Sequence, residues 1–296
     1  MIKLVNVTKF YRGFCAVDHV NLEVGKGVVF GFLGPNGAGK TTTIKMMAGV
    51  LKPTEGQIII NGIDLSEDPS EAKRCTGFIP DRPFLYEKLT GEEFLRFTAG
   101  LYRSNHSSSL ETDIRTLLER FELSHWGAEL IESYSHGMKQ KLGIIQALQH
   151  DPELIIMDEP TEGLDPLNKV VLYDYLKMFR DQGKTIFFSS HDLSEVEKIC
   201  DRIGLVRSGE LIALEHISDL KKKMVRRMEI YFKGAYNPAD FKSPNIQIID
   251  QQTNRLILTI KGDINSVLRA LAKYDINNLI FPEPSLEETF MQFYMN

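Results

Sequence analysis

The sequence predicts an α/β fold: a mainly parallel sheet with an antiparallel edge and a helical insertion, followed by a small α+β domain. In the first part of the chain, short apolar runs alternate with longer amphipathic stretches, which is typical of α/β units. Between about residues 81 and 150 the strand pattern fades and helical spacing replaces it. After a charged run the pattern changes to short alternating strands. We therefore expect two domains, 1–218 and 219–296, with the helical insertion at about 82–150.

The central strands are predicted from near-continuous apolar runs, because strands covered on both faces of a sheet have no side for polar residues. Such runs lie at residues 28–33, 154–157, 185–189 and 203–206. Hairpin or edge strands are predicted at residues 57–61 and 211–214. Strands of both kinds, alternating with helices, indicate a mixed sheet in the first domain.

Helices are predicted where apolar residues share one face. In the insertion, a helix over 110–121 brings together Leu110, Ile114, Leu117, Leu118 and Phe121. The last part of the chain shows strands at 228–232 and 256–260, then a helix, a short strand at 279–281 and a final helix opened by a capping box at 285–288. The first of these two helices has on one face Ile264, Val267, Leu268 and Leu271. This alternation predicts the α+β domain.

Composition excludes several classes of protein. The chain has 296 residues, 43% hydrophobic and 25% charged, which is typical of a soluble globular protein. It lacks an apolar run of the roughly 20 residues that a spanning helix needs, and its start does not resemble a secretory signal. The formal charge of −5 gives no support for a nucleic-acid partner. The three cysteines are widely spaced and are predicted to be reduced thiols, so we expect a cytoplasmic protein whose membrane role requires a partner.

Residues 34–41 form a phosphate-binding loop. They read GPNGAGKT, which fits G-x-x-x-x-G-K-[ST], and they lie between a predicted strand and a helix predicted at 42–48. A glycine-rich turn before a helix is the structural alternative, and the strand before it favours the loop. Glycines let backbone N–H groups surround phosphates, Lys40 would neutralise β/γ-phosphate charge, and Thr41 would hold Mg²⁺. The predicted ATP-binding residues here are Gly34, Pro35, Asn36, Gly37, Ala38, Gly39, Lys40, Thr41 and Thr42.

Two acids end the predicted strand 154–157. Ligands bind an open α/β sheet at the carboxyl ends of its strands, where these two side chains would lie. Asp158 can bind the magnesium shell, and Glu159 can orient or deprotonate the water that attacks the γ-phosphate. An acid pair alone is more often a solvated turn. Together with the phosphate loop, it predicts ATP hydrolysis.

With GPNGAGKTT and LIIMDEP both present, residues of about 2–216 resemble the nucleotide-binding subunits of ATP-binding cassette (ABC) transporters, which share a P-loop NTPase cassette fold. The resemblance implies that Tyr11 stacks on adenine and that His191, after TIFFSS, is the switch histidine near the γ-phosphate. It also implies that Asp165, in EGLD, belongs to the D-loop that touches a partner subunit. The signature that contacts the opposite subunit's ATP would be YSHGM, with Ser135, His136 and Gly137.

Two positions depart from the family pattern. Asp81 stands where the family has the Q-loop glutamine; a carboxylate still suits Mg²⁺ but adds negative charge beside phosphate. His136 replaces the first signature glycine, which restricts how closely the backbone approaches phosphate. The acid at the Q-loop together with Y-S-x-G-M-K-Q is similar to the subfamily that drives exporters of bacteriocins, peptide antibiotics and other amphiphiles.

The resemblance implies a working cycle and partners. MgATP would bridge two cassettes, which form a homodimer or a heterodimer, and hydrolysis would reopen them and move integral membrane permease subunits. The chain would then lie on the cytoplasmic face of the membrane. Phe84, Leu85 and Tyr86 lie where such cassettes receive the permease, although these residues are as often part of a helical core. The alternatives are a soluble ABC ATPase acting on ribosomes or DNA, and a regulatory nucleotide-binding module with little turnover.

The charged run at 221–227, KKKMVRR, has two interpretations. It could lie against anionic lipid headgroups, or it could be a solvated helix face or linker, which is the commoner case. The tail after about residue 219 shows no catalytic motif, so dimerisation, regulation and a covering role all stay open.

Overall fold

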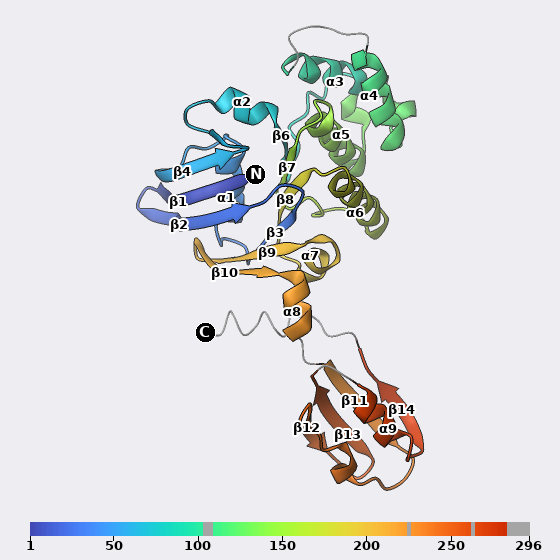
Figure 1. Ribbon diagram of the computed structural model, residues 1–296. Helices are drawn as coiled ribbons and strands as arrows, with labels where there is room; N and C mark the ends of the chain where they lie inside the picture. Colours follow the sequence, from blue (N-terminus) through green and yellow to red (C-terminus); the bar gives the residue numbers. More distant parts are fainter. Residues whose placement is uncertain (103–108, 224–225, 262–263, 283–296) are drawn as a thin grey trace. The chain divides into compact units, whose positions relative to one another are not determined.

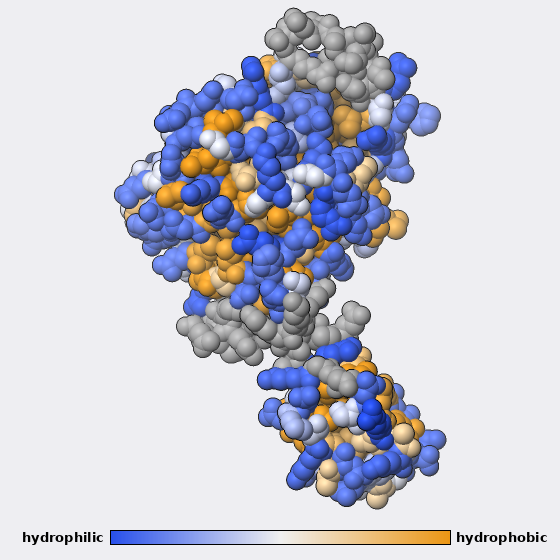
Figure 2. Space-filling view, viewed as in Figure 1, coloured by the Kyte–Doolittle hydropathy of each residue, from blue (hydrophilic) through white to orange (hydrophobic). Residues whose placement is uncertain are grey.

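The computed structural model describes residues 1–102, 109–223, 226–261 and 264–282 (Figure 1). The chain divides into two compact units, Met1–Leu214 and Glu215–Asn296, which are described separately. Among the described helices, none is both long and apolar enough to cross a membrane. On the face shown in Figure 2, hydrophilic residues alternate with small groups of apolar ones.

A six-stranded sheet forms the centre of the first unit, in the order β10-β9-β3-β8-β7-β6. The strands β6, β7, β8, β3 and β9 pair in parallel, which confirms the mainly parallel sheet. Their bounds are β3 Val29–Leu33, β6 Thr76–Ile79, β7 Leu154–Met157, β8 Thr185–Ser190, β9 Arg202–Arg207 and β10 Glu210–His216. Every residue of β3, β7 and β8 is buried, as their continuous apolar runs predict.

An antiparallel sheet lies beside the central one, in the order β2-β1-β4-β5. Its strands are β1 Ile2–Tyr11, β2 Phe14–Val24, β4 Glu55–Ile60 and β5 Ile63–Asp64. Apolar residues of this sheet, of the central sheet and of helix α1, Lys40–Met47, share one core. Only β4 was expected from the sequence. The pairing of β1 with β2 shifts register between Leu4 and Val7 and again near Lys9, so the alternation that marks a strand is interrupted.

The helical insertion lies between β6 and β7. It contains α3 Gly91–Gly100, α4 Ser109–Arg120, two short 3-10 helices at Ser124–Trp126 and Ile131–Ser133, and α5 His136–Leu148. Helix α3 begins with a capping box, in which Thr90 and Glu93 bind each other's backbone N–H groups. The predicted helix at 110–121 is confirmed as α4. The remaining helices of this unit are α2 Pro69–Arg74, α6 Pro166–Asp181 and α7 Leu193–Ile199.

The second unit is a small α+β fold. Its antiparallel sheet has the order β12-β13-β11-β14, and helix α9 and a 3-10 helix share its buried core. Its elements are α8 Ile217–Lys223, β11 Arg226–Phe232, the 3-10 helix Pro238–Phe241, β12 Ile246–Gln251, β13 Arg255–Ile260, α9 Asn265–Leu271 and β14 Ile276–Ile280. Strand β12 was not expected. The helix predicted from residue 285 lies outside the described residues.

Candidate functional site

The phosphate-binding loop follows the buried strand β3, and its last two residues, Lys40 and Thr41, begin helix α1. The predicted helix 42–48 therefore starts two residues earlier, at Lys40. Glycine is required at two points of close approach. A Cβ on Gly34 would lie 2.4 Å from the carbonyl oxygen of Val206, and one on Gly39, whose φ is 100°, would lie 2.5 Å from that of Ala16. A glycine-rich turn of this kind before a helix is suited to bind an anion through its backbone N–H groups.

Lys40 reaches back over this loop. Its Nζ donates to the carbonyl oxygens of Gly34 at 2.7 Å and Pro35 at 3.2 Å, and it lies 3.1 Å from Oε1 of Glu159. The side chain is only 5% exposed. A buried ammonium group held at the loop is suited to neutralise the charge of a bound phosphate.

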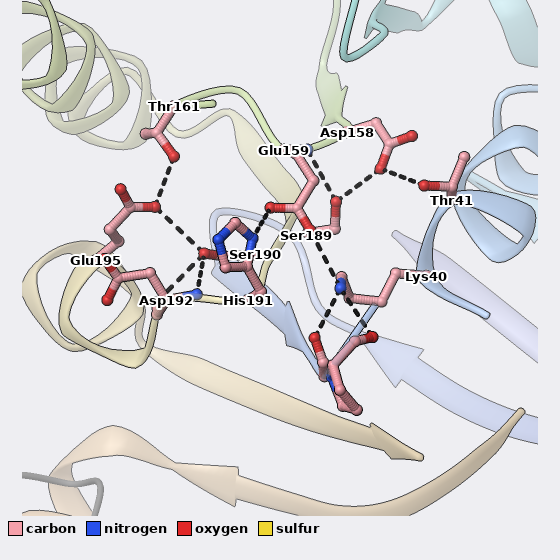
Figure 3. A network of polar contacts seen from close by, with 12 residues as sticks. Lys40, Thr41, Asp158, Glu159, Thr161, Ser189, Ser190, His191, Asp192 and Glu195 are labelled. Atoms are coloured by element: carbon pink, nitrogen blue, oxygen red, sulfur yellow. Dashed lines mark hydrogen bonds and ion pairs between the residues drawn. The ribbon is translucent and has the colours of Figure 1, made fainter. Parts of the chain in front are cut away.

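Asp158 follows strand β7 and is buried. Its Oδ1 accepts hydrogen bonds from Ser189 at 2.8 Å and from Thr41 at 3.1 Å (Figure 3). Burial raises the pKa of the Asp158 carboxyl, and the charges of Glu159 and Asp81 add to this effect. A hydroxyl and carboxylates in an acidic cavity are the hard oxygen ligands that Mg²⁺ prefers, so these residues fit the ion.

Glu159 contacts three groups, and its backbone adopts an unusual conformation. Its φ is 46°, in the left-handed region that non-glycine residues seldom adopt. Its N–H donates to the hydroxyl of Ser189 at 2.9 Å, and its Oε2 lies 2.9 Å from Nδ1 of His191 (Figure 3). The other carboxylate oxygen faces Lys40. The carboxylate is therefore held between a cation and an imidazole.

These side chains border a cavity of about 550 Å³. It is lined by the following residues that the sequence analysis singled out: Tyr11, Asn36, Gly37, Gly39, Lys40, Thr41, Thr42, Asp81, Asp158 and Glu159. Gly34 and Pro35 accept hydrogen bonds from Lys40 through their carbonyl oxygens, and Ala38 is buried. His191 is half exposed and reaches the site through Glu159.

Sequence reasoning missed several residues of the site, among them Phe14 and Ser189. Phe14 lines the cavity and lies opposite Tyr11 in the β1–β2 ladder, so two exposed aromatic rings stand at this end. Without the hairpin, nothing in the sequence links these rings. Ser189 contacts both Asp158 and Glu159 from strand β8. A small polar residue at the end of an apolar run was the available signal.

The signature residues lie elsewhere on the chain, outside the described residues that line the cavity. Ser135 and His136 are exposed, and the Ser135 hydroxyl caps α5 by accepting from the N–H of Met138 at 3.3 Å. Asp165 caps α6 in the same way, accepting from Asn168 at 2.9 Å. His136 adjoins Gly163, because a Cβ on that glycine would lie 3.1 Å from its Nε2. The signature and the D-loop segment thus form one exposed surface.

Comparisons with known proteins agree with this geometry. A family model described as ABC transporter matches residues 17–162. The chain is 34% identical over 300 residues to the bacitracin transport ATP-binding protein BcrA of Bacillus licheniformis, covering 99% of this chain and 96% of that protein. It is 37% identical over 224 residues to the linearmycin resistance ATP-binding protein LnrL of Bacillus subtilis, covering 76% and 72%.

Solved structures show the same fold. An ATP-binding subunit of an ABC transporter matches with a TM-score of 0.70 and 33% identity, covering 75% of this chain and 92% of that one. A dimeric post-hydrolysis state of the cassette MJ0796, bound to ADP and phosphate, matches with a TM-score of 0.68 and 27% identity, covering 73% and 99%. The cassette predicted from the phosphate loop and the acid pair is confirmed: the chain belongs to the ABC transporter family and is one of its ATP-hydrolysing, ATP-binding subunits.

Proposed function

We propose that this ATPase dimerises on MgATP and powers an integral membrane permease that exports peptides, antibiotics or other amphiphiles. The observation that carries the proposal is the separation of two functional surfaces on one chain. Lys40 and Glu159 face the cavity, whereas Ser135 and Gly137 lie outside it, near the D-loop segment. A nucleotide that needs both surfaces must lie between two chains.

In the cavity, the chain's own groups divide the work. Phosphates bind the loop and Lys40, and Tyr11 and Phe14 offer ring faces to the base. Thr41 and Asp158, with Asp81 on the cavity wall, would hold Mg²⁺, which supplies positive charge to the phosphates. Glu159 takes the proton of the attacking water, and His191 keeps the carboxylate oriented through the 2.9 Å contact.

In the dimer, the exposed surface of one chain closes the cavity of the other. Ser135 and Gly137 would contact the partner's γ-phosphate, with His136 beside them, and Asp165 would contact the partner chain. The solved dimer of a similar cassette supports this arrangement. Two chains with one complete set of motifs each are sufficient for two working sites.

An exposed aromatic cluster supports a permease partner. Phe84 is 83% exposed, and its ring lies 6.0 Å from that of Tyr86, which in turn lies 5.7 Å from the ring of Phe97. Exposed aromatic groups of this kind mark interaction surfaces. Relatives named for bacitracin transport and linearmycin resistance support export of amphiphilic compounds. The subunit would then lie at the cytoplasmic face of the membrane.

Co-purification tests the partner. The tagged full chain is extracted gently from native membranes, and the proteins that accompany it in equal amounts are identified by mass spectrometry. We expect an integral membrane protein with several spanning helices. A Phe84→Glu variant should lose that protein and keep its affinity for ATP, because the aromatic cluster is outside the cavity. Ribosomal proteins or nucleic acid in place of a permease would overturn the proposal in favour of a soluble machine.

A further inference from the structure

Glu195 is a buried carboxylate beside the site that the functions above do not use. It lies on helix α7, four residues after His191, and is 3% exposed. A buried charge is costly unless it is paired and hydrogen-bonded, so its contacts show what it holds together.

The two carboxylate oxygens of Glu195 reach three segments of the chain. Oε2 accepts from the hydroxyl of Thr161 at 2.6 Å and from that of Ser190 at 3.2 Å (Figure 3). Oε1 pairs with Nζ of Lys169 at 2.8 Å. Burial and the charge of Glu195 together raise the pKa of the nearby Tyr173 hydroxyl. One carboxylate therefore satisfies two hydroxyls and one ammonium group.

Each contact is adjacent to a functional residue. Thr161 follows Glu159 by two positions, and Ser190 directly precedes His191. Lys169 lies in the first turns of α6, the helix that Asp165 caps. The segments that carry the base, the switch histidine and the D-loop thus meet at one carboxylate.

The backbone of Glu159 needs such support. A non-glycine residue in the left-handed region is strained, and it persists only where the surrounding structure holds it in place. Ser189 holds the N–H of Glu159, and Thr161 anchors the chain two residues further on. Loss of the hydrogen bond between Thr161 and Glu195 would leave the segment after Glu159 less firmly held.

We propose that Glu195 is a positioning residue for hydrolysis: through Thr161 and Ser190 it sets how Glu159 and His191 face each other. The inference rests on the proposed role of Glu159 as the base. Misplacing a reacting group by about 1 Å can cost on the order of 100-fold in rate, whereas substrate affinity depends on contacts elsewhere in the cavity.

The test compares four variants of the full chain. Glu195→Gln keeps the shape but removes the charge, and Thr161→Val removes one contact only. Both should lower kcat by about 10- to 100-fold with the Kd for ATP unchanged, since neither residue lines the cavity. Thr161→Ser, which keeps the hydroxyl, should restore kcat. Lys198→Gln, which changes an exposed charge on the same helix, should match the wild type.

A spectroscopic readout separates positioning from general stability. The imidazole resonances of His191, assigned with a His191→Gln variant, should move in Glu195→Gln and Thr161→Val and stay in place in Lys198→Gln. If Glu195→Gln does not fold, Thr161→Val decides. The positioning role would be overturned if Thr161→Val kept the wild-type kcat and unmoved His191 resonances. Loss of turnover in Glu159→Gln would show in that case that the base itself is correctly assigned. Unchanged turnover in Glu159→Gln would instead overturn the proposed base itself.

Discussion

The Nζ atom of Lys40 lies 3.1 Å from Oε1 of Glu159, and both side chains are buried. The ammonium group of Lys40 and the carboxylate of Glu159 therefore neutralise each other's charge at the cavity. A phosphate entering the loop competes with Glu159 for the lysine. Nucleotide binding would free Oε1 of Glu159 for the attacking water, while Oε2 keeps its contact with His191.

Replacing the base should separate hydrolysis from binding. We expect Glu159→Gln to lower kcat by about 10²- to 10⁴-fold, because the amide cannot accept the proton, while ATP still binds through the loop. Phosphate release and nucleotide titration measure the two effects. The control is Glu67→Gln, an exposed carboxylate that does not line the cavity. A wild-type rate for Glu159→Gln would remove Glu159 from the chemistry.

Removing the lysine should abolish tight ATP binding. Lys40→Ala removes the ammonium group that contacts the loop carbonyls and Glu159, and with it the positive charge offered to the phosphates. It also leaves the buried carboxylate without its cation, so the melting temperature of the nucleotide-free protein should fall. The exposed Lys52 provides the control as Lys52→Ala. Normal affinity of Lys40→Ala in a calorimetric titration would contradict the phosphate role.

The two aromatic residues at the cavity should each contribute to base stacking. Stacking of a base on an aromatic ring contributes about 1–3 kcal/mol, so Tyr11→Ala and Phe14→Ala should each raise the Kd for ATP by about 5- to 150-fold. Phe10, which is comparably exposed to Tyr11 but does not border the cavity, is the matched control. Equal Kd values for Phe10→Ala and Phe14→Ala would show that Phe14 has no part in binding.

A change at Ser135 should block dimerisation without harming the monomer. Ser135→Asp keeps an oxygen that can cap α5, since aspartate is a good N-cap residue. It also places a negative charge where the partner's γ-phosphate would lie. We expect normal melting temperature and normal ATP affinity, but no dimer with MgATP when the change is combined with Glu159→Gln. Light scattering reports the mass, and a dimer of the double variant would count against the trans contact.

One histidine outside the site should make stability depend on pH. His150 stacks on Tyr102 with ring centroids 3.9 Å apart, its Nε2 donates to the carbonyl of Thr76 at 3.1 Å, and burial lowers its pKa. The unfolded chain takes up this proton at about pH 6.5, before the folded one does, so stability falls as pH drops below that value.

The test uses melting temperatures between about pH 7 and about pH 5.5. The wild type should lose more than His150→Phe, which keeps a ring against Tyr102 and has no proton to gain. His125 is exposed, so His125→Phe should retain the wild-type slope. Parallel slopes for wild type and His150→Phe would show that this ring does not couple stability to pH.

Much of the site could be predicted because three buried strands end in it. The apolar runs before Gly34, Asp158 and His191 predict parallel strands, and parallel strands present their carboxyl ends at one edge. Phe14 could not be predicted, because only the pairing of β1 with β2 brings its ring to the cavity, and the position of Ser189 at the end of an apolar run does not by itself show that it contacts the two acids. Glu195 likewise contacts Thr161, 34 residues before it, and Ser190, 5 residues before it. Neither side-chain contact follows from a local sequence pattern.

The left-handed backbone of Glu159 is strained, so the residue lowers the stability of the fold at the position where it would serve catalysis. Glycine adopts this conformation without strain, so Glu159→Gly would relieve the backbone while ending proton transfer. The same change would leave the buried Lys40 without its carboxylate partner, so the relief of backbone strain would come with the loss of a buried ion pair.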